Sequence, residues 1–129
     1  MPASTITLQC DVVVKEILCR AIREYARAAY PEGGSDCAQV ARYTLLELAQ
    51  QIDDGITPDN QCVAISRRPR AMVKAAIEYF YARQDAAAGT GSARQRELMK
   101  EMLQGAVVSG DELAAALATD HAGKPGRPT

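Results

Sequence analysis

The chain has 129 residues, 47% of them hydrophobic, and a formal net charge of −1. That length is typical of one domain that buries its own core, and the near-neutral charge lacks the basic excess of many nucleic-acid-binding domains. Ala accounts for 23 of the apolar residues, whereas Leu, Ile, Val, Met and Phe together number 29 and Trp is absent. So few large side chains favour closely packed helices, or a core that is completed across the interface of a homodimer.

The four cysteines bear on metal binding and on the compartment. Cys10, Cys19, Cys37 and Cys62 are too widely spaced for a zinc site or a redox motif, and the single His cannot complete a ligand set. We therefore expect reduced thiols, no metal and no cofactor, in the cytoplasm. The amino terminus lacks a basic segment followed by a long apolar run, so we predict neither a signal peptide nor a membrane anchor.

The amino-terminal stretch predicts one helix after a short segment of uncertain conformation. Residues 5–10 alternate between polar and apolar, which is typical of an extended arm or a frayed first turn. Asp11 suits the N-cap of a helix over about residues 12–30, in which apolar residues recur at helical spacing. Pro31 ends that helix.

A second helix is predicted over about residues 37–52, capped by Ser35 or Asp36. We expect Gly55 to take the left-handed position after its end. The following residues, 56–66, are ambiguous. We expect a helical turn or irregular chain there, and the alternative is a short strand over 62–65 that pairs with residues 5–8.

The second half of the chain predicts three more helices. The first runs over about residues 69–86 with a buried apolar stripe, and the second opens with the capping-box pair Ser92 and Gln95. A second capping box, Ser109 with Glu112, opens a last helix that ends near residue 119.

These elements predict an all-α protein. We expect a single domain over residues 1–120, a compact bundle of about five helices with at most one very short strand pair. The composition of residues 121–129, with two Pro, two Gly and no large apolar side chain, predicts a disordered tail.

The densest basic cluster precedes and enters the predicted helix over 69–86. Arg67, Arg68, Arg70 and Lys74 lie where the helix dipole disfavours cations. Together with unpaired backbone N–H groups, the guanidinium groups could bind an anion such as a phosphate. The alternative is a solvated run of charge that pairs loosely with the acids of the preceding segment, which are Asp53, Asp54 and Asp59.

Two tyrosines in the same helix suggest a contact surface. Phe80 faces the predicted core, while Tyr79 and Tyr81 fall on opposite borders of the apolar stripe. Tyr is favoured at protein interfaces because it combines a large apolar ring with a polar tip. We propose these two side chains as interface residues, and the alternative is that they close the edges of a monomeric core.

One segment also suggests DNA binding. Residues 94–118 read as a helix, a Gly, a short apolar extended piece and a Ser-capped helix with Glu-Leu-Ala. This order resembles the first half of a winged-helix domain, and the resemblance implies a DNA-binding transcriptional regulator built from residues 92–120. Gly126-Arg127-Pro128 is similar to the core of an AT-hook.

The function that we expect is therefore non-catalytic: a protein–protein interaction, regulatory or accessory protein, with self-association as a homodimer. Short chains of this type resemble the accessory proteins of bacterial prophages and genomic islands. DNA binding is the alternative. A nucleotide or phosphate-ligand binder is the weaker one, suggested by the Gly-rich run over residues 89–92. No arrangement of His, Cys or carboxylates typical of catalysis stands out in the sequence, so we do not expect an enzyme.

Overall fold

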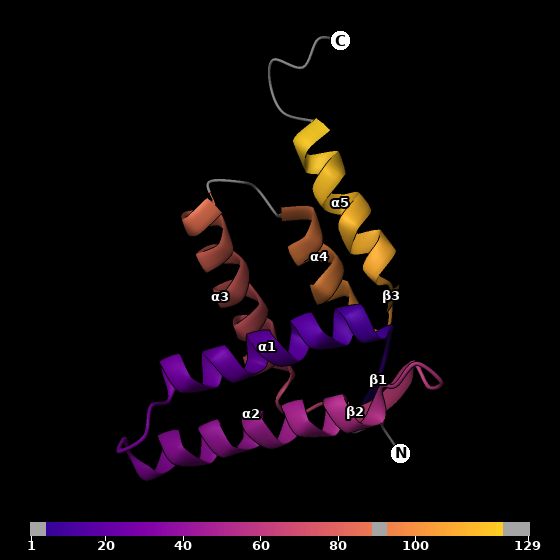
Figure 1. Ribbon diagram of the computed structural model, residues 1–129. Coiled ribbons are helices and arrows are strands. Elements are labelled where there is room, and N and C mark those ends of the chain that lie inside the picture. Colours follow the sequence, from indigo (N-terminus) through magenta and orange to yellow (C-terminus); the bar gives the residue numbers. More distant parts are fainter. Residues whose placement is uncertain (1–4, 89–92, 123–129) are drawn as a thin grey trace.

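The computed structural model describes residues 5–88 and 93–122, and it is mostly helical (Figure 1). In chain order its elements are β1 (Thr5–Cys10), α1 (Val12–Ala29), α2 (Asp36–Gly55), β2 (Cys62–Ser66), α3 (Arg70–Ala88), α4 (Ala93–Met102), β3 (Val107–Val108) and α5 (Gly110–Ala122). The five helices predicted from the sequence are all present. The predicted all-α class is incomplete, because three strands form a small sheet.

The first strand, β1, lies at the centre of the sheet, in the order β2-β1-β3. It runs antiparallel to β2, from Thr5 opposite Ser66 to Gln9 opposite Cys62. It is parallel to β3 only at Gln9 and Cys10. Our expectation of helical or irregular chain over residues 56–66 was therefore wrong for β2, and the alternative of a strand pair is confirmed. Alternate β1 side chains are buried, as in a sheet with one face on the core.

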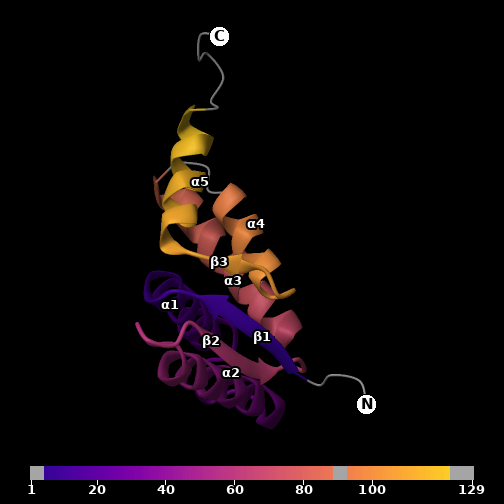
Figure 2. The same ribbon diagram turned by 90° about the vertical axis from the view of Figure 1, so that its right-hand side faces the viewer.

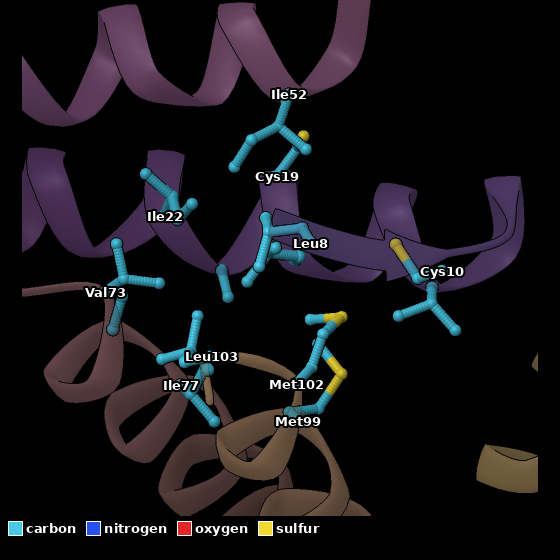
Figure 3. Packing of buried hydrophobic residues seen from close by; sticks show 14 of the residues in the cluster. Leu8, Cys10, Cys19, Ile22, Ile52, Val73, Ile77, Met99, Met102 and Leu103 are labelled. Carbon is cyan, nitrogen blue, oxygen red and sulfur yellow. The ribbon is translucent and has the colours of Figure 1, made fainter. Parts of the chain in front are cut away.

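The helices pack around α1, which contacts α2 along one side and α3 on another (Figure 1). In Figure 2 the sheet lies in front of α1 and α2, with β1 between β2 and β3. Figure 3 shows buried side chains of this core from β1, α1, α3 and α4, among them Leu8, Ile22, Ile77, Met99 and Met102. All five side chains are fully buried.

The helix caps predicted from the sequence are confirmed where the structure describes them. The Asp11 carboxylate accepts a hydrogen bond from the Val14 N–H at 3.0 Å, and the Ser35 hydroxyl accepts one from Ala38 N–H at 3.2 Å. In the second capping box, the Ser109 hydroxyl accepts from Glu112 N–H at 3.1 Å, and the Glu112 carboxylate accepts from Ser109 N–H at 2.9 Å. The other predicted cap, Ser92, lies outside the described residues.

The predicted ends of two helices need correction. Gly55 is the last residue of α2 and its φ is not positive. Among the glycines that the structure describes, the left-handed ones are Gly33 and Gly105. A Cβ at Gly55 would lie 2.5 Å from Cγ2 of Val63, so glycine is needed there because β2 passes close by. At the other end of the chain α5 extends to Ala122. The disordered tail predicted over residues 121–129 is therefore wrong at residues 121 and 122, which belong to α5, and residues 123–129 lie outside the described part of the chain.

Candidate anion-binding groove

A groove of about 850 Å³ lies between β1, the start of α3 and the end of α4. One side is formed by β1, with Thr5, Thr7 and Gln9 among its residues, and another by Gln104 and Gly105 after α4. Five cationic side chains line it: Arg67, Arg68, Arg70, Lys74 and Lys100. The described residues of this lining include no Asp or Glu. The groove is therefore a concentrated positive charge on a protein whose net charge is −1.

The turn from β2 into α3 brings four of these cations to the groove: Arg67 and Arg68 lie in the turn, and Arg70 and Lys74 lie in the first turns of α3. After Ser66 the chain turns at once into α3, and the Ser66 hydroxyl accepts a hydrogen bond from the Arg68 N–H at 3.2 Å. The Arg67 carbonyl accepts one from the Arg70 N–H at 3.0 Å. Pro69 is buried in this turn, so it anchors the backbone while the charged side chains beside it stay exposed. Lys74 follows Arg70 one helical turn later on α3.

Two of the three acids that we considered as partners of the arginines, Asp53 and Asp54, are engaged elsewhere. Asp53 pairs with Lys15 at 3.0 Å and with Arg23 at 3.6 Å, which ties α2 to α1. These bonds, the one from Lys15 first, hold the pKa of Asp53 below its usual range. Asp54 accepts a hydrogen bond from the Gln50 amide at 2.9 Å. No ion pair joins the arginines to this acidic segment in the described chain, and its looser pairing with them stays an untested alternative.

Among the side chains that the structure describes, in residues 5–84 and 93–116, no carboxylate lies within ion-pair distance of Arg67, Arg68, Arg70 or Lys74. Cations gathered at the start of a helix repel one another and oppose the helix dipole, so this arrangement costs stability. A ligand that supplies negative charge would offset that cost.

The fifth cation, Lys100, reaches the groove from α4. It is held by Glu78 of α3 at 2.6 Å and by Glu97 at 3.3 Å. The Glu78 hydrogen bond raises the pKa of Lys100 and lowers that of Glu78. The sequence analysis missed Lys100, because it lies 26 positions after Lys74 and only the folding of α4 against α3 brings the two to one groove. The one local indication in the sequence was Glu97, which lies three residues before Lys100 and can form an ion pair with it on a helix.

The backbone of β1 also opens onto the groove. The Cys10 N–H donates to the Gln61 carbonyl at 3.1 Å, so this residue belongs to a hydrogen-bonded pair of the antiparallel ladder. Hydrogen-bonded and non-hydrogen-bonded pairs alternate, and the backbone groups of Thr5 and Thr7 therefore point away from β2. In the described chain β3 pairs only with Gln9 and Cys10, so it leaves those groups uncovered.

The two tyrosines proposed as interface residues lie apart from the groove lining, and one was placed wrongly. Tyr81 is not at the border of the stripe: it is 3% exposed, and burial raises its pKa to about 12. The stripe is wider than the sequence indicated because α3 contacts both α1 and α4. Tyr79 is half-buried, its ring centroid lies 5.6 Å from that of Tyr25, and its hydroxyl accepts a hydrogen bond from Arg83 at 2.9 Å.

The segment that resembles a winged-helix domain folds as α4, β3 and α5, in the expected order. It is joined to the amino-terminal part of the chain, because β3 pairs with β1 and the Asp11 carboxylate accepts a hydrogen bond from Gly110 N–H at 2.7 Å. The Gly-rich run at 89–92 and the AT-hook-like residues at 126–128 lie outside the described residues. DNA binding stays a hypothesis.

Other site types have no support in the part of the chain that the structure describes. Among the side chains described for residues 5–84 and 93–116, no three His, Cys, Asp or Glu residues lie close enough together to hold a metal ion. None of the helices described there is both long and apolar enough to cross a bilayer. No family model, curated protein or solved structure matches the chain.

Proposed function

We propose that this protein is a non-catalytic interaction protein of the cytoplasm, and that its basic groove binds an acidic segment of another protein. The observation that carries the proposal is the lining of the groove, with five cations and no carboxylate among its described residues. Charge complementarity of this kind selects partners and accelerates their association. The compartment is supported by Cys37 and Cys62, which are exposed free thiols.

An acidic protein segment fits the groove better than a nucleic acid does. The described lining contains no aromatic side chain, whereas single-stranded nucleic acids are usually held by bases stacked on aromatic rings. The chain also lacks the basic excess of many nucleic-acid-binding domains, since its net charge is −1. Exposed strand backbone next to the cations is a feature that a peptide can use.

Self-association through Tyr79 and Tyr81 stays a separate hypothesis. It requires contact by side chains on the surface, and Tyr81 is buried within its own chain. Tyr79 is the one of the pair that keeps an accessible part. The regulatory or accessory role expected from the sequence is compatible with an acidic partner, whose identity would define it.

The proposal is tested by fluorescence anisotropy with a labelled decapeptide of alternating Glu and Thr. We expect the wild-type protein to bind it, with an affinity that falls as salt rises because exposed charges are screened. Replacement of Arg68 and Arg70 by Ala should weaken binding by about tenfold or more, as expected for the loss of two charge-assisted contacts.

The matched control carries Arg20→Ala and Arg27→Ala, which remove the same charge from exposed positions of α1 outside the groove. It should bind the peptide within about twofold of wild type, since only distant charge is lost. Equal weakening by both double variants would show nonspecific charge attraction. No binding of the peptide at low salt, with binding of a DNA duplex instead, would overturn the proposal in favour of nucleic acid.

A further inference from the structure

We infer that the acidic segment binds as an added β-strand along the free edge of β1, beside Arg70 and Lys74. This inference rests on the proposed function and specifies how the partner is held. Addition of a peptide strand to an exposed sheet edge is a known mode of recognition, in which backbone hydrogen bonds supply affinity and alternate side chains supply specificity.

The free edge is created by the turn between α4 and β3. After Met102 the chain makes tight backbone turns, and Gly105 adopts a left-handed conformation with φ 103°. The chain then pairs with β1 at Gln9 and Cys10, and the side-chain amide of Gln9 donates to the Gly105 carbonyl at 3.5 Å. The part of β1 that precedes Gln9 is paired on the β2 side alone in the described chain. Its other edge is one wall of the groove.

The exposed backbone groups favour a peptide over a phosphate chain. Thr5 and Thr7 each present an N–H and a carbonyl to the groove, so a partner must offer both acceptors and donors to satisfy them. An extended peptide offers both in alternation. A phosphodiester backbone offers acceptors alone, and it would leave the carbonyls of β1 without donors.

The cations set the chemistry of the added strand. Arg70 and Lys74 are four residues apart on α3, a rise of about 6 Å. Alternate residues of a strand are about 6.7 Å apart and share a face. Acidic residues at every second position would therefore present carboxylates at nearly the spacing of these two cations. The side chains in between would face the opposite side of the sheet.

The segments outside the described ranges lack the acidic residues that would complement the groove. The three segments have the sequences Met-Pro-Ala-Ser, Gly-Thr-Gly-Ser and Gly-Lys-Pro-Gly-Arg-Pro-Thr. None contains an acid, and the last one carries two further cations. The occupant that matches the groove is a separate acidic segment.

The test compares the alternating Glu-Thr decapeptide with the same peptide N-methylated at its backbone amides. Methylation keeps the carboxylates and removes the donors that pair with a strand edge. We expect the methylated peptide to bind at least about tenfold more weakly, consistent with the loss of two or more hydrogen bonds. Amide hydrogen exchange of Thr5 and Thr7 in the wild-type protein should slow on addition of the unmethylated peptide.

A pair of protein variants tests the same hydrogen bonds by changing the backbone N–H of β1 instead of the peptide. Thr7→Pro removes the outward N–H at a position that does not donate to β2, while Thr7→Ala retains it. We expect weaker binding by the Pro variant only. The methylated peptide and the exchange experiment use the unaltered protein, so they remain decisive if Thr7→Pro fails to fold.

The outcomes separate the two claims. If both peptides bind equally and the Thr5 and Thr7 amides exchange at unchanged rates, strand addition is overturned while the basic groove stands as a binding site for acidic partners. If neither peptide binds at low salt, the proposed function itself is overturned. Slowed exchange at both threonines, together with weakened binding of the methylated peptide, supports the inference.

Discussion

Asp11 is a single side chain that joins two helix starts. One carboxylate oxygen accepts the Val14 N–H at the start of α1, and the other accepts the Gly110 N–H at the start of α5. Both helix amino termini carry partial positive charge, so they attract the negative charge of an Asp side chain placed between them. Gly110 is required at this contact, since a Cβ there would lie 2.8 Å from Cβ of Val13.

We predict that Asp11→Ala lowers the free energy of unfolding by about 2 kcal/mol, because a cap and a charged hydrogen bond are lost together. The measurement is urea unfolding followed by circular dichroism at neutral pH. Glu47→Ala is the control: Glu47 is exposed on α2, and its effect should stay within about 0.5 kcal/mol. An Asp11→Ala protein as stable as the control would contradict the role assigned to Asp11.

The cysteines divide into two classes with different reactivity. Burial raises the pKa of Cys10 to about 12 and that of Cys19 to about 11. Cys37 and Cys62 are exposed. Because the thiolate is the reactive form, we predict that a disulfide reagent at pH 8 labels Cys37 and Cys62 quickly and reaches the other two only after unfolding.

Mass spectrometry of the labelled protein tests this division. The Cys37→Ser, Cys62→Ser double variant is the control, and it should show no fast label while native. Fast labelling of that variant would mean that Cys10 or Cys19 is accessible in the folded state.

At the scale of elements, the helices were predictable and the sheet was not. The cap residues Asp11, Ser35 and Ser109 and the apolar stripes are local signals, and the structure confirms them. The pairing of β1 with β2 joins segments more than 50 residues apart, and the single-sequence pattern did not decide it. The third strand, β3, has only two residues, too few for any periodicity to be recognised.

One ion-pair group connects α3 with α4 and fixes Lys100 at the groove. Its pKa shift gives a prediction with a definite sign. The pKa of Glu78 is lowered in the folded protein, first by the Lys100 hydrogen bond. Its contribution to stability is therefore complete above the ordinary glutamate pKa of about 4.3, and it is lost as the pH falls through the lower folded value.

We predict that Glu78→Gln is less stable than wild type at pH 7, by less than about 1 kcal/mol because the side chain is 44% exposed. The difference should vanish once the pH lies below the folded pKa of Glu78. Urea midpoints measured across the acid range test this, with Glu47→Gln as a control that lacks the ion pair. A difference that persists unchanged in strong acid would show that charge is not its cause.

At the scale of the whole molecule, the groove combines three distant parts of the chain. The sequence drew attention to Arg67, Arg68, Arg70 and Lys74 because they are neighbours, and the structure places all four in one lining. The sequence did not indicate that Lys100 and the edge of β1 also line the groove, since tertiary packing alone brings them to this cluster. Tyr81 shows the reverse error: a local stripe placed it at a border, and the packing of α3 between α1 and α4 buries it.

The central claim is that an acidic protein segment occupies this groove. Its most direct measurement is an NMR titration of the isotope-labelled protein with the alternating Glu-Thr decapeptide. We predict saturable shifts confined to β1, to residues 66–74 and to residues 100–105, which together surround the groove. Shifts centred on α2 or on the exposed face of α1, or none at all at low salt, would contradict it.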